Sequence, residues 1–420
     1  MEFFSYLYIE NKRPMKRILI SACLLLASLS LLGQEPSTTT TAAAPVQPST
    51  VKCVSGPYLQ NVTTDGFTVM WVSDIDALGW VELAPDDGTH FYYTDRPKYY
   101  DMTGAGINPL TKIHTVRITG LQPGTRYRYR IMMKGLRAFN GERDITFTKP
   151  FGANVYTANP PVVTTLKKDY DKLHIAIVND IHANGEDFSK LFAEARGKYD
   201  FVVFNGDMTT TINDEMHMSV YVTPASKLFA DETPLYVTRG NHEFRGLFAR
   251  DWLKWFQTPT GMPYYTFQWG KYFFIALDSG EDKPDDDIEY QGMLSMDQYL
   301  HEQAEWLKGV TESEAFKNAE VRIVFSHIPP RLKSWHGNKN ICEIFVPILN
   351  EAGIDLMISG HEHNYSLCPV GTSNANFPVV VNDNVELMVL DVDGKTINFK
   401  TSDPSGAQTH KGSFHVNDKK

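Results

Sequence analysis

The sequence of 420 residues is poor in the features that mark membrane proteins and disulfide-stabilised scaffolds. It has only 4 cysteines and no Cys-x-x-Cys pair, and it lacks an apolar run of the roughly 20 residues that a membrane-spanning helix needs. Hydrophobic residues make up 42% of the chain, which is ordinary for a globular protein and excludes a mostly disordered one. A globular chain of this length exceeds one compact core, so about two domains are expected.

An excess of positive charge is also missing. The net charge is −10, a poor electrostatic match to a polyanion, so nucleic acid is not expected as a partner. A small anion can still bind such a chain where a local cation, such as a metal ion, overrides the overall sign.

The first 33 residues have the order of an export signal. A basic segment precedes an apolar stretch at 18–32, and the small residue Gly33 separates that stretch from polar residues. Met15 is an alternative start. The apolar stretch is too short for a stable membrane span, and Cys23 lies inside it rather than after it, which argues against a lipid anchor. With a low-complexity linker at 34–50, the sequence predicts an exported protein, periplasmic or extracellular.

Three cysteines remain beyond the export signal, namely Cys53, Cys342 and Cys368. Three cannot form a disulfide framework. A Cys342–Cys368 bridge in an oxidising compartment and a pair of buried free thiols both agree with the sequence.

Residues 51–168 are typical of an all-β domain. The Leu-x-Pro-x-x-x-Tyr spacing that ends at Tyr127 is that of a tyrosine corner, and Trp71 suits the core of a β-sandwich. We expect a sandwich that resembles the fibronectin type III fold, with both residues serving packing. Alternating runs between turns predict strands at 67–71, 114–118 and 126–130.

From residue 169 to 420 the pattern changes to that of an α/β domain with mixed sheets. Two apolar segments around a Gly-Lys turn predict an antiparallel hairpin at 264–269 and 272–277. Apolar runs predict buried strands at 173–178, 201–204, 235–237, 321–325 and 354–358. Helical stretches separate many of them, at 188–196, 296–308 and 343–351.

Polar side chains follow all five of these strands. Because ligands of open α/β sheets bind outside the carboxyl ends of the strands, we expect the five segments to converge. Their nitrogen and oxygen donors outnumber what one metal ion needs, so two ions sharing one carboxylate are expected. Asp207, on a tight Gly-led turn, is the natural bridge. The candidate ligands are Asp180, His182, Asp207, Asn241, His327, His361 and His363.

Each candidate ligand also has a purely structural explanation. A histidine at a strand end is often only hydrogen-bonded, and an Asp or Asn beside Gly is often turn chemistry. What favours a metal centre is the coincidence of four motifs in one order, each after a strand: Asp-x-His, Gly-Asp, Gly-Asn-His-Glu and Gly-His-x-His.

These motifs resemble those of the calcineurin-like metallophosphoesterase superfamily. The preceding domain, with Val-Ser-Gly-Pro-Tyr-Leu-Gln at 54–60, is similar to the N-terminal domain of purple acid phosphatases. The resemblance implies two divalent or trivalent ions, and imidazole and carboxylate donors accept Fe, Mn or Zn. It implies that the first ion is held by Asp180, His182, Asp207 and His363. It implies that the second is held by Asp207, Asn241, His327 and His361.

The ligand set predicts hydrolysis without a covalent protein intermediate. Two bridged cations lower the pKa of a shared water, and the resulting hydroxide attacks phosphorus in line. His242 is the first candidate to protonate the leaving group, with Glu243 orienting its ring. The resemblance suggests His336 as a second such histidine. Arg239 and Arg245 are candidate substrate contacts, unless ion pairs in the core hold them.

Asp278 and the run 281–287 follow the predicted hairpin. We expect a solvated acidic loop there. If it flanks the metals, it repels polyanions and favours small monoesters.

The sequence thus predicts an exported, dinuclear metal-dependent phosphohydrolase that cleaves phosphomonoesters. A phosphodiesterase or nucleotide pyrophosphatase on the same scaffold is the alternative reaction. A carbohydrate- or surface-binding protein with a silent phosphoesterase domain is a different class, and the intact ligand set argues against it.

We predict a colourless enzyme. Purple acid phosphatases carry Gly-Asp-x-x-Tyr, whose tyrosinate on ferric iron gives the colour, but the corresponding residue here is Thr210. His182 stands where they have Gly, and its imidazole can replace the phenolate ligand. Visible absorption spectroscopy checks this prediction: strong charge-transfer absorption in protein purified with iron would contradict it.

Overall fold

The computed structural model describes residues 48–102, 104–141 and 143–416. The predicted export signal and most of the predicted linker lie outside these residues. In this part of the chain no helix is both long and apolar enough to cross a membrane. Cys53, Cys342 and Cys368 are free thiols, so the predicted alternative of a Cys342–Cys368 bridge is not what the structure contains.

The N-terminal part is an antiparallel β-rich domain built around the long strand β2, which pairs with β1, β3, β4 and β5. Trp71 is fully buried, and the Tyr127 hydroxyl accepts a hydrogen bond from the backbone N–H of Gln122 at 3.1 Å, as a tyrosine corner requires. The strands are β1 (Cys53–Gln60), β2 (Phe67–Pro85), β3 (Lys98–Tyr100), β4 (Thr111–Ile118), β5 (Arg126–Phe139), β6 (Ile145–Phe147), β7 (Phe151–Gly152) and β8 (Val162–Thr164).

The rest of the described chain contains two mixed six-stranded sheets. The first has the order β11-β10-β9-β18-β19-β20, and its first three strands are parallel. Its strands are β9 (Lys172–Val178), β10 (Phe201–Asn205), β11 (Leu235–Thr238), β18 (Leu387–Asp393), β19 (Thr396–Ser402) and β20 (Gln408–His415).

The second sheet has the order β12-β13-β14-β15-β17-β16. The predicted hairpin is confirmed, because β12 and β13 pair antiparallel. The strands are β12 (Tyr265–Trp269), β13 (Tyr272–Leu277), β14 (Val321–Ser326), β15 (Leu356–Ser359), β16 (Ser366–Cys368) and β17 (Val379–Val381).

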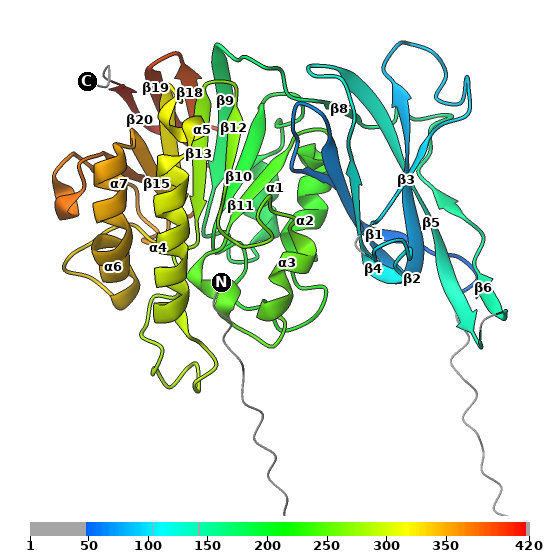
Figure 1. Ribbon diagram of the computed structural model, residues 1–420, viewed down its shortest axis with the longest axis horizontal. Coiled ribbons are helices and arrows are strands. Elements are labelled where there is room, and N and C mark those ends of the chain that lie inside the picture. Colours follow the sequence, from blue (N-terminus) through cyan, green and yellow to red (C-terminus); the bar gives the residue numbers. More distant parts are fainter. Residues whose placement is uncertain (1–47, 103, 142, 417–420) are drawn as a thin grey trace, which may run out of the picture. The chain divides into compact units, whose positions relative to one another are not determined.

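Helices cover the outer faces of the two sheets (Figure 1). Buried residues of α1 and α2 pack on the first sheet, and buried residues of α4 and α7 pack on the second. The helices are α1 (Gly185–Leu191), α2 (Ser219–Ala225), α3 (Trp252–Trp255), α4 (Met296–Glu312), α5 (Glu314–Lys317), α6 (His336–Asn340) and α7 (Val346–Ala352). Short 3-10 or π segments are η1 (Ser226–Ala230), η2 (Asn241–Phe244), η3 (Ala249–Asp251), η4 (Ile341–Phe345) and η5 (Thr372–Asn374).

Element boundaries differ from prediction where caps decide them. Helix α1 begins earlier than expected, because the Asn184 side chain caps it by accepting the backbone N–H of Asp187 at 3.2 Å. The helix expected at 343–351 is divided into η4 and α7, with a proline in the first turn of α7.

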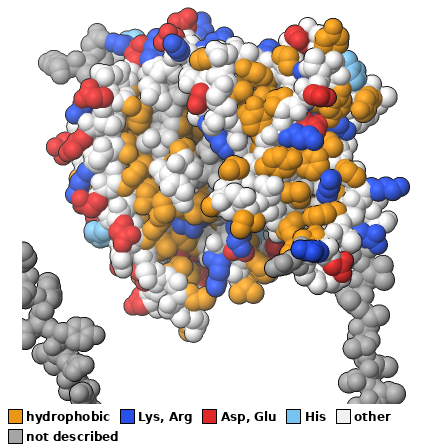
Figure 2. Space-filling model, turned by 45° about the vertical axis from the view of Figure 1, so that its right-hand side comes forward, with side chains coloured by type: hydrophobic (Ala, Val, Ile, Leu, Met, Phe, Trp, Pro, Cys, Tyr) orange, Lys and Arg blue, Asp and Glu red, His pale blue; other side chains and the backbone are white. Residues whose placement is uncertain are grey.

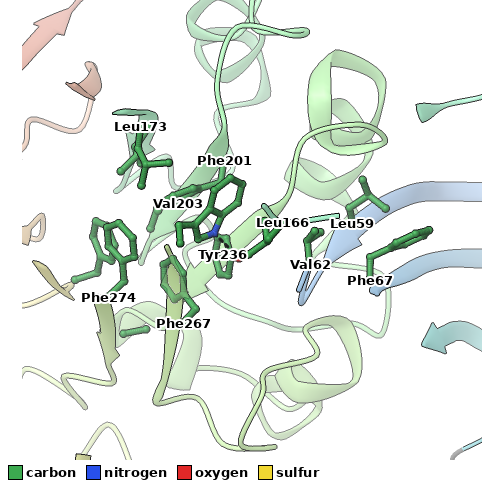
Figure 3. Packing of buried hydrophobic residues seen from close by; sticks show 14 of the residues in the cluster. Leu59, Val62, Phe67, Leu166, Leu173, Phe201, Val203, Tyr236, Phe267 and Phe274 are labelled. Atoms are coloured by element: carbon green, nitrogen blue, oxygen red, sulfur yellow. Dashed lines mark hydrogen bonds between the residues drawn. The ribbon is translucent and has the colours of Figure 1, made fainter. Parts of the chain in front are cut away.

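One hydrophobic cluster fills the space between the sheets and continues into the β-rich domain (Figure 3). At its centre the rings of Tyr236 and Phe267 stack with centroids 3.8 Å apart, and the edge of Phe201 packs against both. Leu59 and Phe67 of the β-rich domain belong to the same cluster. Burial of shared apolar surface therefore joins the β-rich domain to the α/β domain.

Buried hydrogen bonds reinforce this junction. The Tyr58 hydroxyl donates to the carbonyl of Trp255 at 2.7 Å, and the Tyr129 hydroxyl donates to the carbonyl of Asp231 at 2.6 Å. Acidic, basic and hydrophobic side chains are interspersed on the molecular face in Figure 2. That face therefore offers no continuous basic surface to a polyanion.

We predict that Tyr58→Phe lowers the free energy of unfolding by about 1–2 kcal/mol, because the buried carbonyl of Trp255 loses its donor. Urea denaturation measures this change. Tyr93→Phe is the matched control, since Tyr93 is 75% exposed. Equal unfolding free energies for the two variants would show that the hydrogen bond contributes nothing.

Candidate metal centre

The seven predicted ligands all lie in loops that directly follow strands. Asp180 and His182 follow β9, and Asp207 follows β10. Asn241 opens η2 after β11, His327 follows β14, and both His361 and His363 follow β15. The structure brings these five loops to one place, as the carboxyl ends of neighbouring strands require.

Among the residues that the structure describes, three groups of side chains offer ligand atoms within 4.8 Å of one another. Asp207 belongs to two of them, one with His327 and His361 and the other with His182 and His242. The third group is Asp180, His182 and His363. Because Asp207 and His182 are each shared between groups, the three groups form one continuous cluster.

Short distances connect the cluster. His327 Nε2 lies 3.0 Å from Asp207 Oδ2, and His363 Nε2 lies 3.3 Å from Asp180 Oδ1. His182 Nε2 and His363 Nε2 are 3.0 Å apart. Asn241 Oδ1 lies 3.0 Å from His361 Nδ1.

The oxygen and nitrogen atoms of these ligands are better suited to hold a cation than to hydrogen-bond one another. Asp180 Oδ1 is buried without a hydrogen-bond partner, and His182 Nε2 and His363 Nε2 face each other at 3.0 Å. The Asn241 amide fits in either orientation: turned with its nitrogen inward it would donate to Asp207 Oδ2 at 3.2 Å, and with its oxygen inward it suits a cation. Acceptors that converge in this way repel each other unless a positive charge lies between them. Nitrogen and carboxylate donors of this kind suit Fe, Mn or Zn, so the residues present fit the implied metal ions.

The backbone is strained where it presents these side chains. Positive φ values are uncommon outside glycine and cost energy that the surrounding structure must supply. The described residues include eleven such non-glycine positions. Five of them are predicted ligands: Asp180, His182, Asp207, His361 and His363.

Two glycines allow the ligand loops to approach closely. A Cβ at Gly240 would lie 2.2 Å from Asp207 Oδ1, and one at Gly360 would lie 2.6 Å from Asp180 Oδ2. The glycines in the Gly-Asn-His-Glu and Gly-His-x-His motifs are therefore required by space rather than by turn conformation.

The buried charges compensate one another. Burial disfavours a charged imidazole, but Asp207 and Asp180 outweigh it and raise the pKa of His327 to about 10. Burial alone would raise the pKa of Asp207, yet the adjacent His327 holds that pKa well below its usual range. Burial, together with the charge on His327, lowers the pKa of His361 to about 4. A metal ion at this place would displace the His327 proton, since a ligand imidazole must be neutral.

Glu243 has a role that the sequence did not predict. Its carboxylate accepts the backbone N–H groups of Asp207 and Gly240 at 2.8 Å each, and that of Thr209 at 3.2 Å. Burial and the charge of Asp207 raise the pKa of Glu243 to about 7. The side chain thus ties the loop of Asp207 to the loop of Asn241, and its place in the Gly-Asn-His-Glu motif was the only signal.

The expectation that Glu243 orients His242 is wrong. His242 Nδ1 lies 2.8 Å from the carbonyl oxygen of Thr210 instead, and Nε2 lies 3.3 Å from Arg245 Nη1 and 3.9 Å from Asp207 Oδ2. The backbone N–H of His242 donates to Asp207 Oδ1 at 2.8 Å. His242 therefore lies at the edge of the cluster, and a backbone carbonyl orients its ring.

Both candidate arginines are held in ion pairs, the alternative noted from the sequence. Arg239 contacts Asp278 Oδ2 at 2.6 Å and lies 3.8 Å above the ring of Phe244. Arg245 donates to Glu281 Oε1 at 2.8 Å and to Asp282 at 3.1 Å. Carboxylate partners already neutralise these guanidinium groups, which favours the ion-pair alternative over a substrate contact.

The prediction of a solvated acidic loop is wrong for its first carboxylates, although Asp286 in the same run is exposed. Asp278, Glu281 and Asp282 are buried rather than solvated. They pair with the two arginines, which is how a buried carboxylate is normally retained.

His336 does not join the cluster. Its Nε2 lies 3.8 Å from Asp297 and 3.1 Å from Asn340 Nδ2. Nor does His336 line the cavity beside the cluster that is described next. It begins α6, and helical geometry directs it toward Asn340 four residues later.

A cavity of about 380 Å³ adjoins the cluster. Four predicted ligands line it (Asp207, Asn241, His361 and His363), and so does His242. Its other walls are formed by Asp282, Ser334, Trp335, Asn338 and Glu362.

Comparisons with known proteins agree with this geometry. Residues 173–365 match the calcineurin-like phosphoesterase family, and residues 56–148 match the N-terminal domain of purple acid phosphatases. No curated protein matches the chain in a sequence search. Purple acid phosphatase PPD1 from yellow lupin (Lupinus luteus) seeds is similar in structure, with a TM-score of 0.59 and 16% identity over 86% of this chain and 74% of that one. A structure of PhoD has a TM-score of 0.54 and 12% identity, covering 84% and 91%.

At these identities the likeness to solved structures shows the fold alone. Together with the two family matches it confirms the predicted fold class, a β-rich N-terminal domain followed by an α/β phosphoesterase domain with mixed sheets.

We predict that Gly360→Ala lowers metal affinity at least about tenfold, because the new methyl group displaces the Asp180 carboxylate. Elemental analysis after dialysis against a fixed metal concentration measures the change. Gly309→Ala, in α4 with open space around the new Cβ, is the control. Metal retention by Gly360→Ala equal to that of the control would show that Asp180 does not hold metal.

Proposed function

We propose that this chain, whose residues 173–365 match the calcineurin-like phosphoesterase family and whose residues 56–148 match the N-terminal domain of purple acid phosphatases, is a hydrolase that cleaves phosphomonoesters at two metal ions. The observation that carries the proposal is the convergence of seven nitrogen and oxygen donors from five loops, with Asp207 shared between groups. A single ion would leave some of these donors unused.

The chain's own residues would divide the work as follows. Asp180, His182 and His363 would hold one ion, Asn241, His327 and His361 the other, with Asp207 common to both. When bound, the ions supply charge for the phosphate oxygens and an activated water near neutral pH. Glu243 keeps the two halves of the site in register through the backbone N–H groups that it accepts.

His242 is proposed to protonate the leaving oxygen. The Thr210 carbonyl accepts from Nδ1, which leaves Nε2 as the atom that holds and gives the proton. Arg245 Nη1 lies 3.3 Å from that nitrogen, and because a guanidinium only donates, this contact must open when Nε2 carries the proton. The ion pair with Glu281 holds Arg245 beside the ring, so we assign it a positioning role rather than a substrate contact.

The walls of the cavity support monoesters over larger anions. Asp282 and Glu362 lie on them, each paired with an arginine, and no lysine or arginine among the lining residues is left to bind an additional phosphate group. Export to the periplasm or extracellular space is also proposed, on the basis of the basic and apolar order of the first 33 residues.

The test is metal analysis combined with an ester panel. We expect about two ions per chain and higher kcat/KM on 4-nitrophenyl phosphate than on bis(4-nitrophenyl) phosphate. Asp207→Asn is expected to lose both ions and to reduce turnover by roughly a thousandfold. Asp286→Asn, an exposed carboxylate in the loop after β13, is the control.

Two results would overturn the proposal. Faster turnover of the bis-ester would indicate a phosphodiesterase. Near-zero metal content without turnover of either ester would favour a binding protein with a silent phosphoesterase domain.

A further inference from the structure

An unpartnered tryptophan stands on the wall of the metal-centre cavity. Trp335 lines the cavity yet is 59% exposed. Its ring has no aromatic, cationic or hydrogen-bonding partner within the described part of the chain. A large apolar side chain left open at a concave site is suited to cover an apolar part of a ligand.

The two residues Gly337 and Asn338, which closely follow Trp335, are anchored to neighbouring segments. The backbone N–H of Gly337 donates to the carbonyl of Asp282 at 3.1 Å, and Asn338 Nδ2 donates to the carbonyl of Pro329 at 2.8 Å. A Cβ at Gly337 would lie 2.6 Å from the carbonyl oxygen of Glu281, so the loop packs directly against its neighbour. Trp335 thus directly precedes two anchored residues, which limits the movement of its backbone and lowers the entropy lost when a ligand stacks on it.

The cavity offers no positive side chain to a second anionic group. Among the described residues that line it there is neither lysine nor arginine. Two arginines beside the lining residues are held in ion pairs. Arg331 forms a bidentate pair with Glu362 at 2.8 and 2.7 Å. Arg245 donates to both Glu281 and Asp282. A leaving group with its own phosphate would therefore find no unpaired lysine or arginine on the cavity wall, because Arg245 and Arg331 are held by Asp282 and Glu362.

We propose that the substrate is a phosphomonoester whose alcohol is uncharged and carries a flat ring, and that this ring stacks on Trp335. The inference rests on the proposed phosphomonoesterase function and names its substrate class. Nucleoside monophosphates and aryl phosphates share this chemistry. Stacking of a base on an aromatic side chain typically changes affinity by roughly 5- to 100-fold.

The experiment compares kcat/KM of the metal-reconstituted enzyme for adenosine 5′-monophosphate, ribose 5-phosphate, adenosine 5′-diphosphate and 4-nitrophenyl phosphate. We expect the monophosphate to exceed ribose 5-phosphate about tenfold, chiefly through a lower KM, and to exceed the diphosphate by a similar factor. Trp335→Ala should remove most of the advantage over ribose 5-phosphate, and Trp335→Phe should retain part of it.

Leu332→Ala is the matched control, since Leu332 lies in the same loop, is 45% exposed and does not line the cavity. A loss in Trp335→Ala with adenosine 5′-monophosphate assigns a nucleoside ester, and a loss confined to 4-nitrophenyl phosphate assigns an aryl ester. No loss with either substrate, or a diphosphate turned over as well as the monophosphate, overturns the inference. Absence of turnover on all four esters would instead overturn the proposed function, and this inference with it.

Discussion

Two buried carboxylates that need positive charge set the constraint on this structure. Asp180 and Asp207 are almost fully buried, and His327 Nε2 lies 3.8 Å from one and 3.0 Å from the other. Buried charges are retained only where they are paired or coordinate a metal. The left-handed backbone at the ligands, the close approach at Gly360 and the backbone N–H groups gathered by Glu243 all keep these carboxylates in place.

Local patterns in the sequence were sufficient to predict the fold class and the convergence of the candidate ligands. Apolar strands followed directly by Asp-x-His or Gly-His-x-His encode both the sheet and the edge at which the side chains meet. The tyrosine corner at Tyr127 was predictable for the same reason, since its hydrogen bond closes within six residues. The identity of each ligand's partner ion still comes from the family resemblance and stays a prediction.

What the sequence did not predict depends on contacts between distant segments. Arg239 and Arg245 flank a ligand motif, but their partners lie 39 and 36 residues away in a loop whose charges looked solvated. Glu243 was placed next to His242 by sequence proximity, whereas its carboxylate accepts from backbone N–H groups 34–36 residues earlier. His336 is close in sequence to the cavity residue Trp335, but the first turn of α6 takes it elsewhere.

The hydrophobic cluster shared by the β-rich domain and the sheets bears on how the chain must be handled. Leu59 and Phe67 fill the same core as Phe201 and Tyr236, so each domain completes part of the other's interior. Shared packing of this kind couples the unfolding of the two domains, whereas domains with separate cores unfold independently. Separating the β-rich domain from the α/β domain would expose buried apolar surface on both. The β-rich domain is therefore an integral part of the folded protein.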